Sequence, residues 1–522
     1  MTERLFGVET EYALTGLDAR GLPIDRESVL SHFMALARAR LPHIPDVTGR
    51  GLFLATGARF YIDAPDHPEF TTPECTTPWD VVRYTQAGER TLLGLASQLV
   101  KRERRIAEVV ILRSNVDYSG SGSTWGTHES YLHRSNPRAL PAHVIPHLVS
   151  RIIYTGAGGF NSRFRHGIEF TLSPRVPHLE HTVSEQSTQA RGIFHTKDES
   201  LSSTGYHRLH ILCGESVCSE HAAWLKVGTT ALVLALVDGG AIPGDAVHLQ
   251  SPLSAMQTFA SDPTCTATAQ ASSGKELTAL AIQRHYLAMV EARLDTRCMP
   301  PWARAVCRLW RATLDRLATA PDSMTTQLDW AMKLALFKRR AQQRGIAWES
   351  LRQWNYIAVQ LGAALGRCAP RDERLSVGMI LDEHGPVADE VRRLTPYAQT
   401  HGLEWSQLPT FIQLRQELFE IDTRFGQLGD KGIFTALDAA GVLAHRVDGV
   451  AAIAQAMEYA PAVGRAHLRG RRIRELTGNG ERYVCDWHGL WDHHGARRLD
   501  LQDPFDASAE WQPWTPGEDC PF

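Results

Sequence analysis

Residues 57–75 read GARFYIDAPDHPEFTTPEC, and the first half of this stretch alternates polar and apolar side chains. Successive side chains of a strand point to opposite faces, so Arg59, Tyr61 and Asp63 share one face of a strand predicted around residues 60–64. The residues between them are apolar. A strand with an apolar back and a polar front either faces water or lines a polar cleft.

The segment after this strand is rich in polar side chains. Each of them, taken alone, is as compatible with a solvated surface as with a site. Together with an arginine and an aspartate they supply an anion binder, hard oxygen ligands and a candidate base, which is what phosphoryl chemistry requires. These side chains are His67, Glu69, Thr72 and Glu74.

A second strand, predicted over residues 4–14, carries Glu9 and Glu11 two positions apart and therefore on one face. Two neighbouring carboxylates repel each other, whereas a cation between them turns the repulsion into a binding site. Mg²⁺ prefers carboxylate oxygens together with substrate phosphate. The alternative interpretation is a solvated strand face.

A third group of polar residues surrounds the glycine-serine loop YSGSGSTWG at 118–126. The loop lacks the GK[ST] of a P-loop, so a hinge is the more common explanation and a phosphate cradle is the alternative. Isolated basic residues follow later in the chain, and each one alone is compatible with a surface charge. The candidate site residues of this group are Asn115, His128, Arg208 and His210.

Composition limits the classes of protein. The chain has 522 residues, 43% hydrophobic and 22% charged, with a net charge of −3, so nothing marks it as a binder of nucleic acid. The longest apolar run, residues 231–237, is too short to span a membrane. Nine cysteines without a CxxC pair indicate reduced thiols. These features predict a cytoplasmic enzyme or binding protein without a membrane or nucleic-acid partner.

The order of predicted elements indicates an α+β fold, because strands dominate before about residue 215 and helices after it. A long helix is predicted from about Pro78 to Lys101, with Thr77 as its N-cap. A largely apolar helix is predicted over residues 219–237.

Two similar strings lie in the helix-rich region, GIAWESL at 345–351 and GLEWSQL at 402–408. They are either a duplicated helical element or a chance likeness. A basic helix is predicted over Arg465–Arg474. We predict a catalytic domain over 1–440, with a helical insertion near 345–410, and a small C-terminal domain with a tail over 441–522.

Several strings resemble the Pup ligase and depupylase family, which is related to glutamine synthetase. The likeness runs from residue 4 to about 505 and is interrupted near 345–410. Besides GAR-Y-D-HPE, the strings are GVETEY at 7–12, WGTHESYL at 125–132, HRLHILCGES at 207–216 and LKVGTTALVL at 225–234.

This resemblance implies a curved antiparallel sheet that cradles ATP and is backed by helices. It also implies site roles: Glu9, Tyr61 and Glu69 for Mg²⁺, Arg59, Thr72 and Trp487 for ATP, and Asp63 as the catalytic carboxylate. Glu11 and the four residues of the third group are further candidates.

The implied reaction begins when ATP phosphorylates the C-terminal glutamate of the modifier Pup, which gives an acyl phosphate. Asp63 then takes a proton from the lysine of a protein substrate, and the amine attacks to form an isopeptide bond. In the depupylase branch (Pup deamidase), the equivalent aspartate serves hydrolysis of the same bond.

The sequence does not decide between the branches. The short spacing from Glu11 to Arg59 favours the ligase, whereas PECTTPWDVV at 73–82 favours the depupylase. Ser130 replaces an asparagine of the family, and the segment from Lys197 departs from the family pattern. A divergent amidoligase that acts on another carboxylate is therefore a third interpretation.

Overall fold

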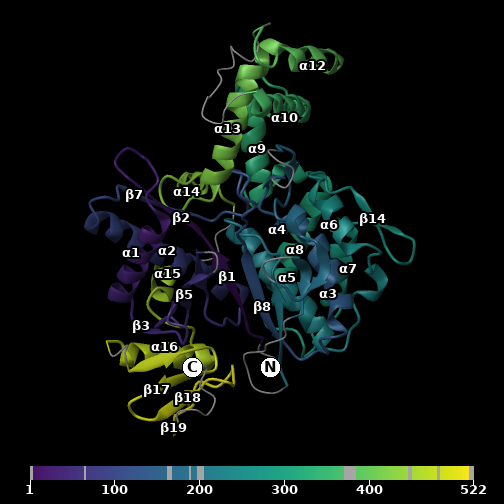
Figure 1. Cartoon of the computed structure of the whole chain (residues 1–522). Coiled ribbons are helices and arrows are strands. Elements are labelled where there is room, and N and C mark those ends of the chain that lie inside the picture. Colours follow the sequence, from purple (N-terminus) through teal and green to yellow (C-terminus); the bar gives the residue numbers. More distant parts are fainter. Residues whose placement is uncertain are drawn as a thin grey trace.

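A nine-stranded sheet forms the centre of the protein (Figure 1). The computed structural model describes residues 4–63, 66–161, 167–186, 190–196, 205–368, 382, 384–444, 450–478 and 482–515. In spatial order the strands are β11 (His181–Ser184), β12 (Gly192–His195), β13 (His207–Ile211), β8 (Thr127–His133), β1 (Phe6–Glu11), β6 (His67–Thr71), β5 (Arg59–Asp63), β4 (Gly51–Leu54) and β3 (His43–Pro45).

The neighbouring strands are antiparallel except at one edge, where β11 runs parallel to β12. This arrangement confirms the predicted α+β fold with a sheet backed by helices. The predicted strand over residues 4–14 is broken at Tyr12, whose amide bonds the carbonyl of Pro68. The chain after this break forms β2 (Ala13–Leu17), which leaves the main sheet and pairs with β7 (Glu108–Leu112).

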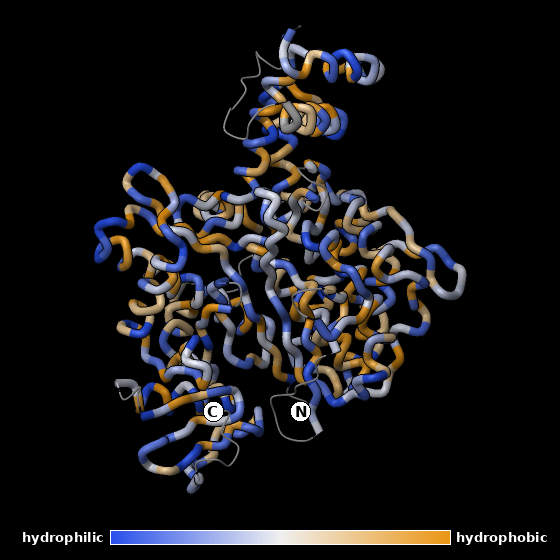
Figure 2. Tube along the Cα trace, viewed as in Figure 1, coloured by the Kyte–Doolittle hydropathy of each residue, from blue (hydrophilic) through white to orange (hydrophobic). Residues whose placement is uncertain are grey.

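The back of the sheet packs against helices. The predicted long helix forms as α2 (Pro78–Arg102), and the amide of Asp80 donates to Oγ1 of Thr77 at 3.2 Å, which confirms the N-cap. Phe6 and Val8 of β1 belong to the same buried cluster as α2 and α5 (Glu220–Asp238). Hydrophobic residues are plentiful in these layers, and hydrophilic residues line the outer loops (Figure 2).

Helix α5 is long and apolar enough to cross a membrane, but 89% of its apolar window is buried inside the protein. Its composition therefore reflects its place in the core. The other helices of this body are α1 (Arg26–Arg40), α3 (Leu140–Ser150), α4 (Ile152–Thr155), α6 (Pro252–Ala260), α7 (Ala279–Glu291), α8 (Ala303–Thr319) and α14 (Ile433–Ala439).

A helical arm projects from the body (Figure 1). The two similar strings form the same turn in this arm, in which a glycine with positive φ, 68° at Gly345 and 63° at Gly402, follows a helix. The amides of Ile346 and Leu403 reach back to the last turn of that helix, and a 3₁₀ turn then opens the next helix. The helices of the arm are α9 (Asp329–Gln343), α10 (Leu351–Cys368), α12 (Ala388–Thr400) and α13 (Leu408–Phe425).

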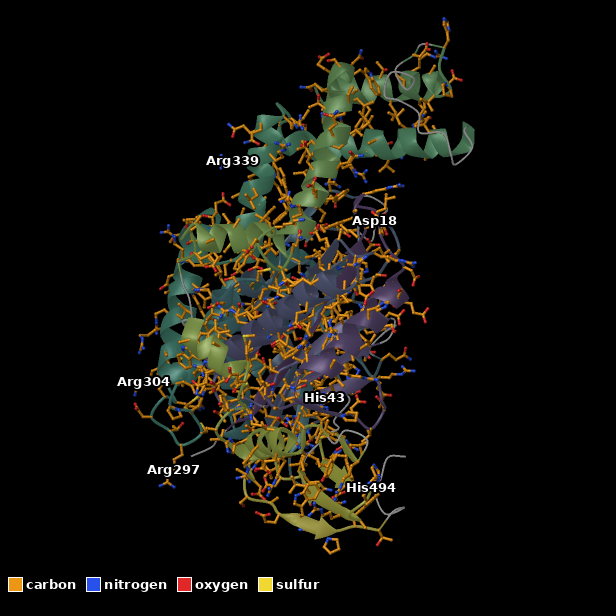
Figure 3. All side chains as sticks on the ribbon, turned by 90° about the vertical axis from the view of Figure 1, so that its left-hand side faces the viewer. Asp18, His43, Arg297, Arg304, Arg339 and His494 are labelled. Atoms are coloured by element: carbon orange, nitrogen blue, oxygen red, sulfur yellow. The ribbon has the colours of Figure 1, made fainter. Side chains whose placement is uncertain are left out.

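A small C-terminal unit lies at the opposite end of the molecule from the arm, as the positions of Arg339 on α9 and of His494 show (Figure 3). The predicted basic helix forms as α16 and packs against β3 and β4. The elements of this unit are α16 (Gly464–Leu476), β16 (Tyr483–Cys485), β17 (Gly489–Asp492), β18 (Arg497–Asp500) and β19 (Trp511–Pro513), whereas α15 (Val450–Ala456) packs against α2 of the body.

One charged pair is enclosed between the back of the sheet and the helices. Glu129 of β8 is fully buried, and both of its oxygens accept from Arg151, at 2.9 and 2.6 Å. Burial alone would raise the pKa of Glu129, but the charge of Arg151 and its hydrogen bonds hold that pKa below its ordinary value. Arg151 also donates to Thr230 of α5 at 2.7 Å, so the pair joins two layers.

We predict that Arg151→Met destabilises the protein by about 3–5 kcal/mol, because it leaves a buried carboxylate without its partner. The matched control is Arg284→Met. Arg284 pairs with Asp315 at the surface, where both side chains are more than half exposed, and its loss should cost no more than about 1 kcal/mol. Urea denaturation of both variants checks the prediction, and equal losses of stability would contradict it.

Candidate active site

The strand register gathers the predicted site residues on one face of the sheet, which we call the front face. Glu9 lies opposite Thr71 on one side and His128 on the other. Glu69 lies opposite Glu11 and Tyr61. Residues that lie opposite each other on neighbouring strands point to the same side of the sheet, and alternate residues along each strand share that side. The front face therefore extends across β13, β8, β1, β6 and β5. Its polar residues include Glu9, Glu11, Arg59, Tyr61, Asp63, Glu69, His128, Arg208 and His210.

Three carboxylates of the front face form one compact group. Glu11, Asp63 and Glu69 each offer an oxygen, and these atoms lie within 4.8 Å of one another. Burial raises the pKa of Glu69, and the negative charges of neighbouring carboxylates raise it further. Within the described part of the chain, the buried Oε1 of Glu69 has no hydrogen-bond partner. Oxygen donors of this kind fit a hard cation such as Mg²⁺.

A second group of donor atoms adjoins the first. One atom each of Glu9, His128 and His210 lies within the same 4.8 Å limit, and Nδ1 of His128 is 3.9 Å from Oε2 of Glu9. Burial lowers the pKa of His210 to about 3, so its imidazole is neutral and offers a lone pair. Burial opposes ionisation of Glu9, yet the hydrogen bond from His128 and nearby positive charge keep its pKa well below the ordinary value. This group also fits a cation.

Glu11 is held by the loop that precedes β8. The amide of Gly126 donates to Oε2 of Glu11 at 2.7 Å, and His67 lies 3.6 Å from Oε1. A Cβ on Gly126 would lie 1.4 Å from Nη1 of Arg175, so a larger residue there would displace this buried side chain. The last glycine of the glycine-serine loop therefore positions a carboxylate of the front face.

Arg59 and Tyr61 pack on each other near the sheet edge. The guanidinium carbon of Arg59 is 4.0 Å from the centre of the Tyr61 ring. Asp46 accepts from Nη2 and Nε of Arg59, at 2.5 and 3.2 Å. Burial raises the pKa of Tyr61 well above its ordinary value, as do the charges of Glu69 and Glu9. Asp46 was not predicted, because the turn that carries it belongs to no motif.

Thr72 and Trp487 lie more than 400 residues apart in sequence and line the same pocket as Glu9. Oγ1 of Thr72 accepts from the amide of Val8 at 3.1 Å, which ties the pocket wall to β1. Arg208 lines this pocket as well, and so does Arg465 of α16.

Three further residues singled out in the sequence lie in different surroundings from one another. Both ends of the Asn115 amide bond the backbone of Ser216, at 3.0 and 2.8 Å, so this side chain links two segments and is not gathered into either donor group. Ser130, which departs from the family pattern, lies on the front face with its Oγ 3.1 Å from Nδ1 of His210. Lys197 lies outside the residues that the structure describes.

The fold and the site together define an α+β protein whose central sheet gathers carboxylates on one face, beside a pocket lined by Glu9, Thr72 and Trp487. The family sequence model described as "Pup-ligase protein" matches residues 4–360 and 391–491. The chain therefore belongs to the Pup-ligase family, as its motifs predicted.

Curated relatives fall in both branches of the family. A Pup–protein ligase of Brachybacterium faecium is 29% identical over 523 residues, which cover 97% of this chain and 94% of that protein. A Pup deamidase/depupylase of Mycolicibacterium smegmatis is 35% identical over 345 residues, which cover 64% of this chain and 66% of that protein, just under two thirds of its length.

Solved structures share the fold. The ligase PafA in its complex with the prokaryotic ubiquitin-like protein Pup superposes with a TM-score of 0.72 at 23% identity, over 97% of this chain and 90% of that chain. The Pup ligase PafA in complex with ADP gives a TM-score of 0.66 at 22% identity, over 92% of this chain and 91% of that chain.

The crowded carboxylates lead to a prediction about Glu69→Gln. The neutral amide removes repulsion, so the variant without metal should melt at the temperature of the wild type or above it. Millimolar Mg²⁺ should raise the melting temperature of the wild type alone, since a ligand at a hundredfold excess over its Kd stabilises by about 2.7 kcal/mol.

The matched control is Glu185→Gln, which changes an exposed glutamate after β11. Thermal melts with and without Mg²⁺ give the comparison. A Glu69→Gln variant that keeps the full Mg²⁺ response would contradict a role of this carboxylate as a cation ligand.

Proposed function

We propose that this chain is an ATP-dependent ligase that joins the C-terminal glutamate of Pup to a lysine of a protein substrate. The arrangement of the front face carries the proposal, because it combines two groups of side chains that could hold a cation with a pocket that two parts of the chain build. Membership in the Pup-ligase family and similarity to a ligase over 97% of the chain support it. ADP in a structure of the same fold supports ATP as the nucleotide.

The proposed roles follow from position on the front face. Glu9, Tyr61 and Glu69 would hold Mg²⁺, and the bound ion would supply charge neutralisation for a transferring phosphoryl group. Tyr61 keeps its proton, so it serves this group as a neutral oxygen or as a hydrogen-bond donor. Thr72 and Trp487 would contact ATP, since both line the pocket beside Glu9. Arg59 would face the phosphates, with its orientation fixed by Asp46.

Asp63 is the proposed proton acceptor for the incoming lysine. It is the exposed member of the carboxylate group, whereas Glu69 and Glu11 are buried. A protein lysine can approach only a group that solvent also reaches. Asp63 would take a proton from the ammonium, and the free amine would then attack the activated glutamate carbonyl.

Depupylation is the second candidate function. Over about two thirds of the chain the two branches match almost equally, with 35% identity to a depupylase and 34% to a Pup–protein ligase. Both reactions use the same cleft and differ in whether an amine or a water reaches the carbonyl. In the hydrolytic reaction Asp63 would act as nucleophile or would activate water.

We assign the enzyme to the cytoplasm. The seven cysteines whose side chains the structure describes are all free. Free thiols are typical of a reducing compartment.

Asp63→Asn should reduce turnover by about a thousandfold or more while ATP binding remains, because the amide keeps the shape of the side chain and cannot accept the proton. The matched control is Asp66→Asn, which changes an exposed aspartate three residues away and should leave turnover unchanged. Single-turnover assays and calorimetry with ATP and Mg²⁺ give the two readouts. Full activity of the Asp63→Asn variant would remove this residue from the mechanism.

One assay separates the candidate functions. The protein is incubated with ATP, Mg²⁺, Pup that ends in glutamate and a lysine-bearing acceptor, and in parallel with a preformed conjugate. We expect new conjugate together with ADP. Release of Pup from the conjugate would instead identify a depupylase. Neither product, in a protein that still binds ATP, would point to another carboxylate substrate and refute a role in Pup chemistry.

A further inference from the structure

The pocket beside Glu9 is built from two parts of the chain that are distant in sequence. Strands β1 and β8 supply one wall, and Arg465, Trp487 and Pro504 of the C-terminal unit supply the other. Trp487 lies in the turn between β16 and β17. Asp486 caps this turn by accepting from the amides of His488 and Gly489, at 2.6 and 2.8 Å. The place of the indole therefore depends on how the C-terminal unit sits on the sheet.

A carboxylate whose side chain is 15% exposed joins the C-terminal unit to the sheet. Glu74 follows Thr72 of the pocket by two residues and accepts from Nε of Arg465 at 2.6 Å and from Nη2 of Arg469 at 2.5 Å. Burial alone would raise the pKa of Glu74, but the two guanidinium charges hold it at about 2. The side chain of Arg469 has no exposed surface. Loss of one partner in such a pair leaves a buried charge uncompensated, so the three side chains act as a unit.

Arg469 also contacts the indole itself. Its guanidinium carbon lies 4.9 Å from the centre of the Trp487 ring and 5.6 Å from that of Phe53. Phe53 meets Trp487 edge to face, with ring centres 5.1 Å apart. Since Phe53 belongs to β4, the indole is fixed between a strand of the sheet and a helix of the C-terminal unit.

Two glycines set the depth at which α16 rests on the sheet. A Cβ on Gly470 would lie 2.6 Å from the carbonyl oxygen of Ala55, and one on Gly57 would lie 3.0 Å from that of Ala466. Gly57 also has a positive φ of 77°, which favours glycine. Nη2 of Arg469 donates to the carbonyl of Gly57 at 2.8 Å. A side chain at either glycine would therefore push α16 away from the sheet.

We propose that Glu74 and Arg469 are positioning residues for nucleotide binding. They act through Trp487, because the ion pair and the guanidinium stack hold the indole at the pocket wall. This inference rests on the proposed use of ATP and adds two residues to it: Glu74, which lines the pocket, and Arg469, which does not line it.

The test uses the full chain and measures the Kd of ATP with Mg²⁺ by calorimetry. Arg469→Met should weaken ATP binding by about tenfold, because it removes both the ion pair and the stack on the indole. Arg469→Lys keeps the charge and should recover part of the affinity. The affinity for Pup should remain that of the wild type. The matched control is Arg471→Met, which changes an exposed arginine on the same helix and should leave both affinities unchanged.

A double-mutant cycle separates positioning from general stabilisation. If Arg469 acts through the indole, Arg469→Lys should change the Kd of ATP little when Trp487→Ala is already present. Additive effects, or a melting temperature that falls while the Kd of ATP stays that of the wild type, would overturn the proposal. A wild-type protein that binds no ATP would instead refute the proposed function.

Discussion

The carboxylates of the front face repel one another, and the side chains and amides around them must offset that repulsion. Donor oxygens of Glu11, Asp63 and Glu69 crowd within 4.8 Å, a distance at which like charges in a partly buried site repel by several kcal/mol. The neighbourhood offsets part of this cost with the amide of Gly126 and the imidazole of His67. A cation bound to these oxygens, as proposed above, would offset the rest of the repulsion.

The structural carboxylates and those of the front face differ in whether an arginine pairs with them. Behind the sheet and under the C-terminal unit, Glu129 and Glu74 each bind guanidinium groups at short distance. On the front face, in the part of the chain that the structure describes, the nearest basic side chains of Glu9 and Glu11 are those of His128 and His67, at 3.9 and 3.6 Å, and Glu69 forms no ion pair. Arginine partners neutralise Glu129 and Glu74, whereas the carboxylates of the front face keep oxygens that a cation could bind.

Strand alternation allowed the front face to be predicted, because it depends only on neighbours in sequence. Arg59, Tyr61 and Asp63 share a face for that reason. The pairing of Arg59 with Asp46 could not be predicted, since it requires the register between β4 and β5. Nor could the docking of the basic helix on Glu74, although the four-residue spacing of its arginines places them on one side of the helix.

The repeated turn of the helical arm has a consequence for how this fold can change in size. A single residue inserted into β1 would turn every later side chain of that strand to the opposite face and scatter the carboxylates. The glycine-capped turns at Gly345 and Gly402 are specified locally, so another copy would add a helical hairpin without disturbing any strand. We therefore expect the arm to accept inserted helices or a fused domain without a change in the positions of the front-face carboxylates.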